Sequence, residues 1–465
     1  MIYEFSFSNF RSYKTEATIS FDAKPISEFE QTLIHGRDTE LLPVCVIYGP
    51  NGGGKSSVLM AIQNMQRIVL SPLMQLAFMK KKNEQLSDVS LEEVQKNLSF
   101  EEEEEVFYKW DDFGRNLPTQ YSILFQVGGW KYRYELKISK DSVNEENLYI
   151  QYANGDFDAV FERDEEGVYF CEELEGLDIE NMNESLPLLS YIGMFKNIKK
   201  IDQVLRFFFS IQTINFDMPT QDRTIFVKAL ERDKKRILSV IQSMGIDIVD
   251  VRIEYEEDGK VHEIYTKHQL DNESFKELIF HEESSGTRKI FSILSRILSG
   301  IDKGRFFVID ELDAKLHPAL LQRIIELFTD SELNRNGAQM LFTSHDLTTM
   351  SYKVFRRDEI WFSAINGYDE SVLYSLVDFH KENGKKVRND EIYSKQYLEG
   401  RYGANPYLRN IVNWEVEERG SLADAKKRAK KAYEEYQKAG VTAPSAMVPV
   451  TRMFELVEEL EKYLG

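Results

Sequence analysis

The residues best suited to chemistry lie in one short stretch: Gly49, Pro50, Asn51, Gly52, Gly53, Gly54, Lys55, Ser56 and Ser57. Glycine, four residues and then Gly-Lys-Ser is the pattern of a phosphate-binding loop when a strand precedes it and a helix follows. The glycines let backbone N–H groups turn towards a phosphate, and the helix N-terminus adds partial positive charge. We therefore expect Lys55 and the loop amides to bind nucleotide phosphates, and Ser56 to bind Mg²⁺. The alternative is a glycine-rich turn that carries a surface lysine.

Two acidic residues, Asp310 and Glu311, end the apolar run 306–309. Burying carboxylates at the end of a strand is costly unless a positive group waits there. We expect Asp310 to hold Mg²⁺ through water and Glu311 to polarise an attacking water as general base. The alternative is a pair of N-cap acids that opens the next helix.

Two further stretches could contact a γ-phosphate. His345 follows the next apolar run, 340–343, where it could hydrogen-bond that phosphate. Ser284, Ser285 and Gly286 open a predicted helix, and small residues at a helix N-terminus form an anion-binding nest. Because a second phosphate site within one chain is redundant, we expect Ser284 and Gly286 to bind the γ-phosphate held by another copy. An ordinary serine N-cap is the alternative.

These residues need a particular set of elements to position them. The pattern predicts strands within 1–50, including 41–48 before the glycine-rich loop. After residue 280 it predicts an alternation of helices and strands, with helices at 287–299 and 319–328 and strands at 305–309 and 340–343. Alternation of this kind indicates a parallel sheet. We therefore predict an α/β fold in which residues 1–70 and 280–390 form one discontinuous core.

The intervening residues 71–279 are predicted to be an α+β insertion. They contain a polar stretch, then antiparallel strands over 120–175 with one wet face, then helical spacing over 196–245. Residues 391–465 are predicted to be a C-terminal helical segment that could dock a partner, with a lysine-rich amphipathic helix at 423–439.

The composition limits the class of protein. With 465 residues the chain exceeds the roughly 250–300 at which a single core stops growing. A net charge of −20 argues against a basic surface for duplex DNA. The two cysteines, Cys45 and Cys171, lie far apart without metal-ligand spacing, which indicates a reducing compartment. No leader pattern and no apolar stretch near 18 residues is present, so we expect a cytoplasmic protein.

The order of these motifs resembles the ABC-type ATPase head of SMC proteins, RecF and the OLD-like ATPases. By this resemblance residues 49–56 are Walker A, 283–287 a degenerate signature, 306–311 Walker B and 312–314 the D-loop. The resemblance implies that Asp313 contributes to the nucleotide site and that His345 is the switch histidine. Residues 9–13 are similar to the N-terminal segment of SMC and RecF heads, whose arginine approaches the nucleotide, and this implies a nucleotide-binding role for Arg11.

The chain departs from the family pattern at two points. Ser285 replaces the first glycine of the signature, as in the OLD-like group, and Gln120, Gln126 and Gln151 all remain open as the Gln-loop residue. Residues 311–318 and 397–406 look like the stand-alone ATPases of abortive-infection and phage-defence pairs, of the AbiL, RloA and PARIS AriA type. Such ATPases act with a separately encoded nuclease, often of TOPRIM class. A fused TOPRIM domain is not expected here, because no acidic strand-end cluster follows residue 390.

The sequence thus predicts an ATP hydrolase that uses Mg²⁺ and ATP and pairs head to tail as a homodimer or higher oligomer. By resemblance it would be a switch that controls a nuclease or toxin partner in anti-phage defence. A RecF-like DNA-repair ATPase is one alternative, with basic candidates at 80–82, 196–200 and 426–431. A scaffold assembled by ATP without significant turnover is another. A membrane-transporter subunit is least favoured.

Overall fold

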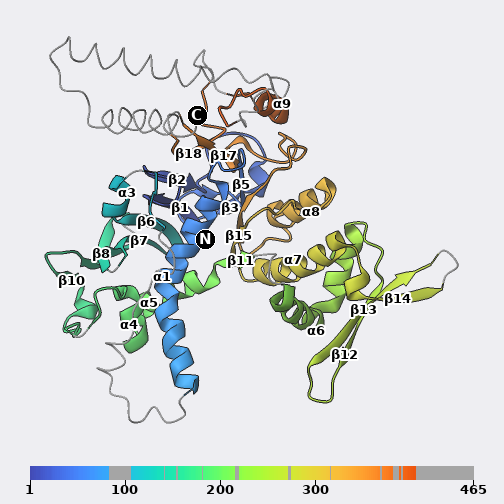
Figure 1. The fold of residues 1–465 in the computed structure, drawn as a ribbon, viewed down its shortest axis with the longest axis horizontal. Helices are drawn as coiled ribbons and strands as arrows, with labels where there is room; N and C mark the ends of the chain where they lie inside the picture. The colour runs from blue at the N-terminus through green and yellow to red at the C-terminus, as the bar shows by residue number, and fades with distance from the viewer. Residues whose placement is uncertain are drawn as a thin grey trace, which may run out of the picture. The chain divides into compact units, whose positions relative to one another are not determined.

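The structure is a computed structural model, and the elements below follow Figure 1. It describes residues 1–82, 106–110, 112–140, 142–152, 155–180, 182–214, 219–270, 274–314, 316–366, 369–380, 387–388 and 391–404. All of them belong to one compact unit, Met1–Pro406. The predicted helix at 423–439 and the basic stretch 426–431 lie outside the described residues.

A six-stranded sheet carries the predicted core motifs. Its strand order is β11-β15-β16-β5-β17-β18, with bounds Gln212–Ile214, Phe306–Ile309, Gln339–Thr343, Val44–Tyr48, Ile360–Ile365 and Ser371–Ser375. Neighbouring strands are parallel except β17 and β18, so the sheet is mixed. Strands β5 and β15 are buried along their whole length, as the continuous apolar runs of a covered sheet require. The predicted α/β class is confirmed.

The strand order explains how distant motifs meet. Strand β16 lies between β15 and β5 and is parallel to both. The carboxyl ends of parallel strands meet at one edge of a sheet, and ligands bind outside that edge. The glycine-rich loop after β5, the acidic pair after β15 and His345 after β16 therefore lie at the same edge.

Helices cover this sheet. The main ones are α1 (Lys55–Lys82), α6 (Pro219–Ser243), α7 (Ser285–Ile301) and α8 (Pro318–Thr329). The apolar face of α7 is buried, and α6 packs against it. Gly300 brings α7 close to the sheet, since a Cβ there would lie 2.1 Å from the Phe307 ring. The predicted helices at 287–299 and 319–328 are confirmed.

A second sheet, of seven antiparallel strands, has the order β10-β9-β8-β7-β6-β1-β2. Its bounds in that order are Val168–Phe170, Phe157–Arg163, Ser142–Gln151, Trp130–Ser139, Thr119–Val127, Ile2–Ser8 and Ala17–Ser20. The antiparallel strands predicted over 120–175 are confirmed. They do not form a separate sheet, because β1 pairs with β6 on one side and β2 on the other.

Strand β11 lay inside the predicted insertion but pairs with β15 of the core sheet. The helical pattern over 196–245 gave no sign of it, because three residues are too few to show a period of two. Helix α1 also continues across the predicted boundary at residue 70. The insertion is thus hydrogen-bonded into both large sheets, while the domain boundaries stay a prediction.

A three-stranded antiparallel sheet, not predicted, leads into α7. It consists of β12 (Asp250–Tyr255), β13 (Val261–Gln269) and β14 (Phe275–Ile279), followed by the 3₁₀ turn η4 (Phe280–Glu282). The remaining elements are β3 (Ile34–His35), β4 (Glu40–Leu41), α3 (Asp112–Asn116), α4 (Leu188–Phe195), α5 (Lys199–Ser210), α9 (Tyr393–Leu398) and the 3₁₀ turns η1 (Glu30–Thr32), η3 (Glu172–Leu174) and η5 (Arg357–Glu359).

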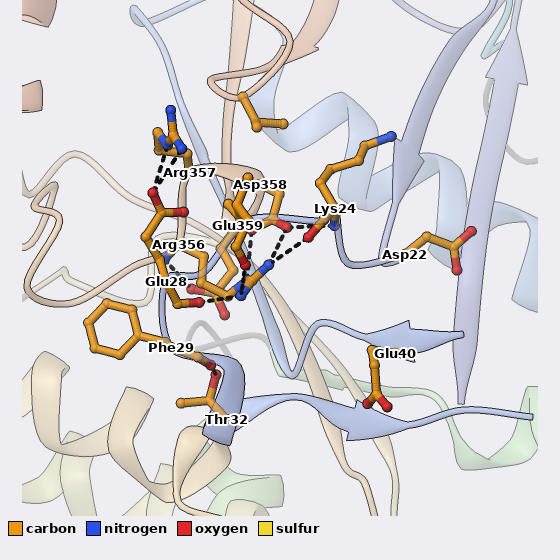
Figure 2. Close-up of polar contacts among 12 residues, drawn as sticks. Asp22, Lys24, Glu28, Phe29, Thr32, Glu40, Arg356, Arg357, Asp358 and Glu359 are labelled. Carbon is orange, nitrogen blue, oxygen red and sulfur yellow. Dashed lines mark hydrogen bonds and ion pairs between the residues drawn. The ribbon is translucent and has the colours of Figure 1, made fainter. Parts of the chain in front are cut away.

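A buried arginine joins the N-terminal region to the turn that leads into β17 of the core sheet (Figure 2). The Arg356 side chain is fully buried and pairs with Asp358 at 2.9 Å. It also donates to the carbonyl oxygens of Lys24 and Glu28, so the loop after β2 is anchored beside β17. Glu359 accepts the Arg356 N–H at 2.8 Å, and burial raises the pKa of Glu359 to about 8.

None of the helices in the described part of the chain is long and apolar enough to cross a membrane.

Candidate nucleotide site

A cavity of about 620 Å³ lies at the shared edge of the core strands. Its lining residues are Arg11, Ser12, Pro50, Asn51, Gly52, Gly54, Lys55, Ser56, Ser57, Val106, Lys109, Trp110, Asp310, Glu311 and His345. The structure therefore unites the glycine-rich loop, the acidic pair, the predicted switch histidine and Arg11. The volume of this cavity lies within the roughly 300–1,000 Å³ typical of small-molecule sites.

The Lys55 ammonium is held over its own loop. Its Nζ donates to the carbonyl oxygens of Gly49 at 2.9 Å and Pro50 at 3.1 Å. An ammonium has three hydrogens, so one remains to point at a phosphate. Burial lowers the pKa of Lys55 from its usual value, although Asp310 and Glu311 oppose the shift. Lys55 is thus a positioned cation at the start of α1.

Residues remote in sequence fix the shape of the loop. Ser363 Oγ donates to the Gly53 carbonyl at 2.6 Å and accepts from the Tyr13 hydroxyl at 2.7 Å. Gly54 has φ +99°, and a Cβ there would lie 2.5 Å from Ser371 Oγ. Only glycine fits this left-handed, crowded position. Sequence reasoning missed Tyr13, Ser363 and Ser371, because nothing local marks a residue that supports a loop from another strand.

The predicted metal ligands meet directly. Ser56 Oγ donates to Asp310 Oδ1 at 3.2 Å, and Thr343 Oγ1 donates to the same oxygen at 2.5 Å. Mg²⁺ prefers oxygen ligands and keeps several waters, so one hydroxyl and one carboxylate suit it. These residues fit a magnesium site in which Ser56 and Asp310 would be the ligands. Thr343, which was not predicted, would orient the carboxylate.

Glu311 has an unusual backbone for a non-glycine residue, with φ +48°. Its N–H donates to Thr343 Oγ1 at 2.8 Å, and Lys289 of α7 donates to its carbonyl at 3.3 Å. A left-handed conformation costs of order 1–3 kcal/mol and persists only where the surroundings enforce it. Here it accompanies an exposed carboxylate that lines the cavity. This suits the predicted general base, and that role stays a prediction.

His345 and Asp313 are coupled through the backbone. The His345 N–H donates to Asp313 Oδ2 at 3.1 Å, while the other Asp313 oxygen is buried without a partner among the described residues. His345 is exposed and lines the cavity, whereas Asp313 does not. Within one chain Asp313 therefore supports the loop that carries His345, and its predicted nucleotide contact stays a prediction.

The predicted signature residues do not line their own cavity. Ser284 is the N-cap of α7, where its Oγ accepts the Thr287 N–H at 3.0 Å, and both Ser284 and Ser285 are exposed. Gly286 lies in the first turn of the same helix. An exposed helix N-terminus remains free to meet a phosphate elsewhere, so the role in trans stays a prediction.

Glu283, just before the cap, is held by the three-stranded sheet. His268 Nε2 lies 2.6 Å from Glu283 Oε1, and Thr266 Oγ1 donates to the same oxygen at 2.5 Å. The start of α7 is thus tied to β13.

The three Gln-loop candidates have other positions. Gln126 accepts from the Tyr3 hydroxyl at 2.7 Å, Gln151 donates to the Gly155 carbonyl at 2.7 Å, and Gln120 is exposed on β6. None of them lines the described cavity.

Comparison with known proteins identifies the family of this chain. Residues 44–351 match the family described as "AAA domain, putative AbiEii toxin, Type IV TA system", and the chain belongs to that family. No curated protein sequence matches.

Among solved structures, the chain is similar to the SMC head domain from Thermotoga maritima, with 12% identity, a TM-score of 0.38 and coverage of 80% of this chain and 98% of that one. It is also similar to an Smc head bound to the C-winged helix domain of ScpA, with 13% identity, a TM-score of 0.40 and coverage of 80% and 97%.

The fold and the site together define a class. A glycine-rich loop between a buried strand and a helix, with an acidic strand end beside it, makes this an α/β protein of the phosphate-loop NTPase fold. Within that class the chain is a member of the AbiEii-type AAA family.

Proposed function

We propose that this chain is a Mg-ATP-dependent ATPase that works as a head-to-tail homodimer, in which each copy completes the site of the other. The observation that carries this proposal is the cavity. It is lined by the glycine-rich loop, by Ser56 and Asp310, and by Glu311 and His345. Lys55 and the loop amides bind the phosphates, Ser56 and Asp310 bind the metal, and Glu311 activates water. His345 senses the γ-phosphate, and Arg11 contacts the nucleotide.

The role in trans explains why Ser284, Ser285 and Gly286 stand outside their own cavity. An exposed helix N-terminus with free N–H groups suits an anion. In a symmetric pair each copy presents the same surface, so one phosphate loop can face the other copy's α7. Binding of ATP then joins the copies, and hydrolysis releases them.

Mixing two inactive variants tests the shared site. Lys55→Ala removes phosphate binding. Ser284→Asp keeps a good N-cap but sets a negative charge against the γ-phosphate. Each variant alone should be inactive, while an equimolar mixture should recover about one quarter of the wild-type rate, because half the dimers are mixed and each holds one intact site. A mixture as inactive as its components would refute the shared site.

The biological role we propose is a switch in anti-phage, abortive-infection defence that controls a separately encoded nuclease or toxin, with TOPRIM class favoured. The family description names a toxin of a toxin–antitoxin system. Within the described residues, part of the candidate DNA track at 196–200 is neutralised, since Lys200 pairs with Glu173 at 2.9 Å. This favours a protein partner over direct DNA binding.

Phage challenge of cells that express this chain with the product of the adjacent gene tests the role. Protection should be lost with Lys55→Ala. It should be retained with Lys303→Ala, a surface lysine on the turn that follows α7. Protection that survives Lys55→Ala would contradict an ATP-controlled switch.

A further inference from the structure

Trp110 stands at the rim of the cavity without an assigned role. It is 72% exposed, and of the well-exposed large apolar side chains in the described part of the chain, it is the one that lines this cavity. An indole in this setting needs a reason, because exposing it costs the burial energy that a tryptophan otherwise contributes.

The backbone before Trp110 is fixed to the loop that carries Arg11. The Arg11 N–H donates to the Val106 carbonyl at 2.6 Å, and the Tyr108 N–H donates to Asn9 Oδ1 at 3.1 Å. Tyr108 itself is buried. Both Asn9 and Arg11 have φ +51°, so this loop holds a conformation that non-glycine residues rarely adopt.

The backbone after Trp110 is fixed to the same asparagine. Asn9 Nδ2 donates to the carbonyl oxygens of Gly114 at 2.9 Å and Leu117 at 2.8 Å. Gly114 lies so close that a Cβ there would be 2.1 Å from the Tyr108 carbonyl oxygen. Asn9 therefore holds backbone groups on both sides of Trp110, beside the loop that carries Arg11.

The cavity offers two kinds of chemistry. Lys55, Ser56 and Asp310 suit phosphates and Mg²⁺, to which a neutral indole can offer only one N–H donor. The lining also includes Val106 and Trp110, and their apolar surface suits the flat, π-faced part of a nucleotide. Bases stack on exposed aromatic rings in many nucleic-acid sites, and the stacking tolerates any base.

We propose that Trp110 is the base platform of this site: its indole stacks on the nucleobase of the nucleotide whose phosphates lie on Lys55. The proposal rests on the nucleotide-binding function proposed above. Since every base presents a π face, Trp110 contributes affinity without selecting adenine over guanine.

Equilibrium binding of probes with and without a nucleobase tests this proposal. Titration calorimetry would compare Mg-ATP, Mg-GTP and Mg-tripolyphosphate on Glu311→Gln, which slows hydrolysis, with and without Trp110→Ala. We expect Trp110→Ala to weaken ATP and GTP binding by roughly 5- to 100-fold and to leave tripolyphosphate unchanged. Trp110→Phe should recover most of the loss. Tyr169→Ala, which removes another exposed ring, on β10, should change nothing.

The outcomes separate the two proposals. If Glu311→Gln with Trp110 intact binds neither ATP nor tripolyphosphate, the ATPase function itself is wrong. If ATP binds equally with and without Trp110, the base platform is wrong and the ATPase stands. Equal weakening of tripolyphosphate binding would mean that Trp110 supports the loop or donates its N–H to a phosphate and does not stack on the base. A loss of affinity that varies with protein concentration would mean that Trp110 contacts another copy. Either result overturns the proposal.

Discussion

At the scale of single residues, the catalytic proposal depends on the Glu311 carboxylate. We expect Glu311→Gln to keep ATP binding while slowing turnover by about 10²- to 10⁴-fold, because the amide cannot take a proton from water. Phosphate release measured beside ATP binding checks this, with Glu326→Gln on the exposed face of α8 as the matched control. Undiminished turnover would remove Glu311 as the base.

Thr343 gives a second prediction at this scale. Its hydroxyl contacts both the Asp310 carboxylate and the Glu311 N–H. Loss of a group that orients a metal ligand commonly lowers metal affinity or activity by 10- to 100-fold. Thr343→Val should therefore raise the Mg²⁺ concentration needed for half-maximal turnover by about that factor, and Thr343→Ser should restore it. An unchanged Mg²⁺ dependence would show that Asp310 needs no such support.

Glu359 makes stability depend on pH. Its pKa is about 8 in the folded protein and about 4.5 in an ordinary environment. Between these values the unfolded chain loses a proton that the folded chain keeps, so this group lowers the free energy of unfolding as pH rises. Glu359→Gln should make the unfolding free energy fall less steeply across that window. Urea unfolding of the wild type and of Glu359→Gln from pH 5 to 8 measures the two free energies of unfolding. The same dependence on pH in both proteins would contradict this role of Glu359.

At the scale of elements, α7 is connected to both the signature and the acidic strand. Lys289 donates to the carbonyl oxygens of Glu311 and Ala314, so the helix that begins at Ser284 also holds the turn after β15. We expect Lys289→Met to lower turnover with little change in the KM for ATP. It should also reduce the free energy of unfolding by about 1–3 kcal/mol, since two partly buried carbonyls lose a donor. A variant with normal turnover and lower stability would limit Lys289 to a structural role.

At the scale of the whole molecule, the buried Arg356 side chain joins segments more than 300 positions apart, because it donates to the carbonyl oxygens of Ile26 and Glu28. Removing one partner of a buried ion pair commonly costs about 3–5 kcal/mol, whereas replacing both partners by apolar residues costs less. We expect Arg356→Met to destabilise the fold by that amount, and Arg356→Met with Asp358→Leu to destabilise it less. Chemical unfolding of both variants provides the comparison. A double variant that is less stable than the single one would contradict this account.

The sequence alone determined the motifs and the class of fold. The glycine spacing before Lys55, the apolar run that ends at Asp310 and the helical period after Ser284 are local patterns. Local patterns can be read without knowing what lies across the sheet. They were sufficient to predict the β5–α1 turn, the acidic strand end and His345 at one site.

Only the tertiary structure decided how these parts are held together. Strand β11 was missed because it is too short to show a period, and it joins the core only through pairing with β15. Thr343, Tyr13 and Trp110 belong to the site through contacts with residues distant in sequence. Such contacts depend on strand order and register, which arise when the chain buries its core and leave no mark in the neighbouring residues.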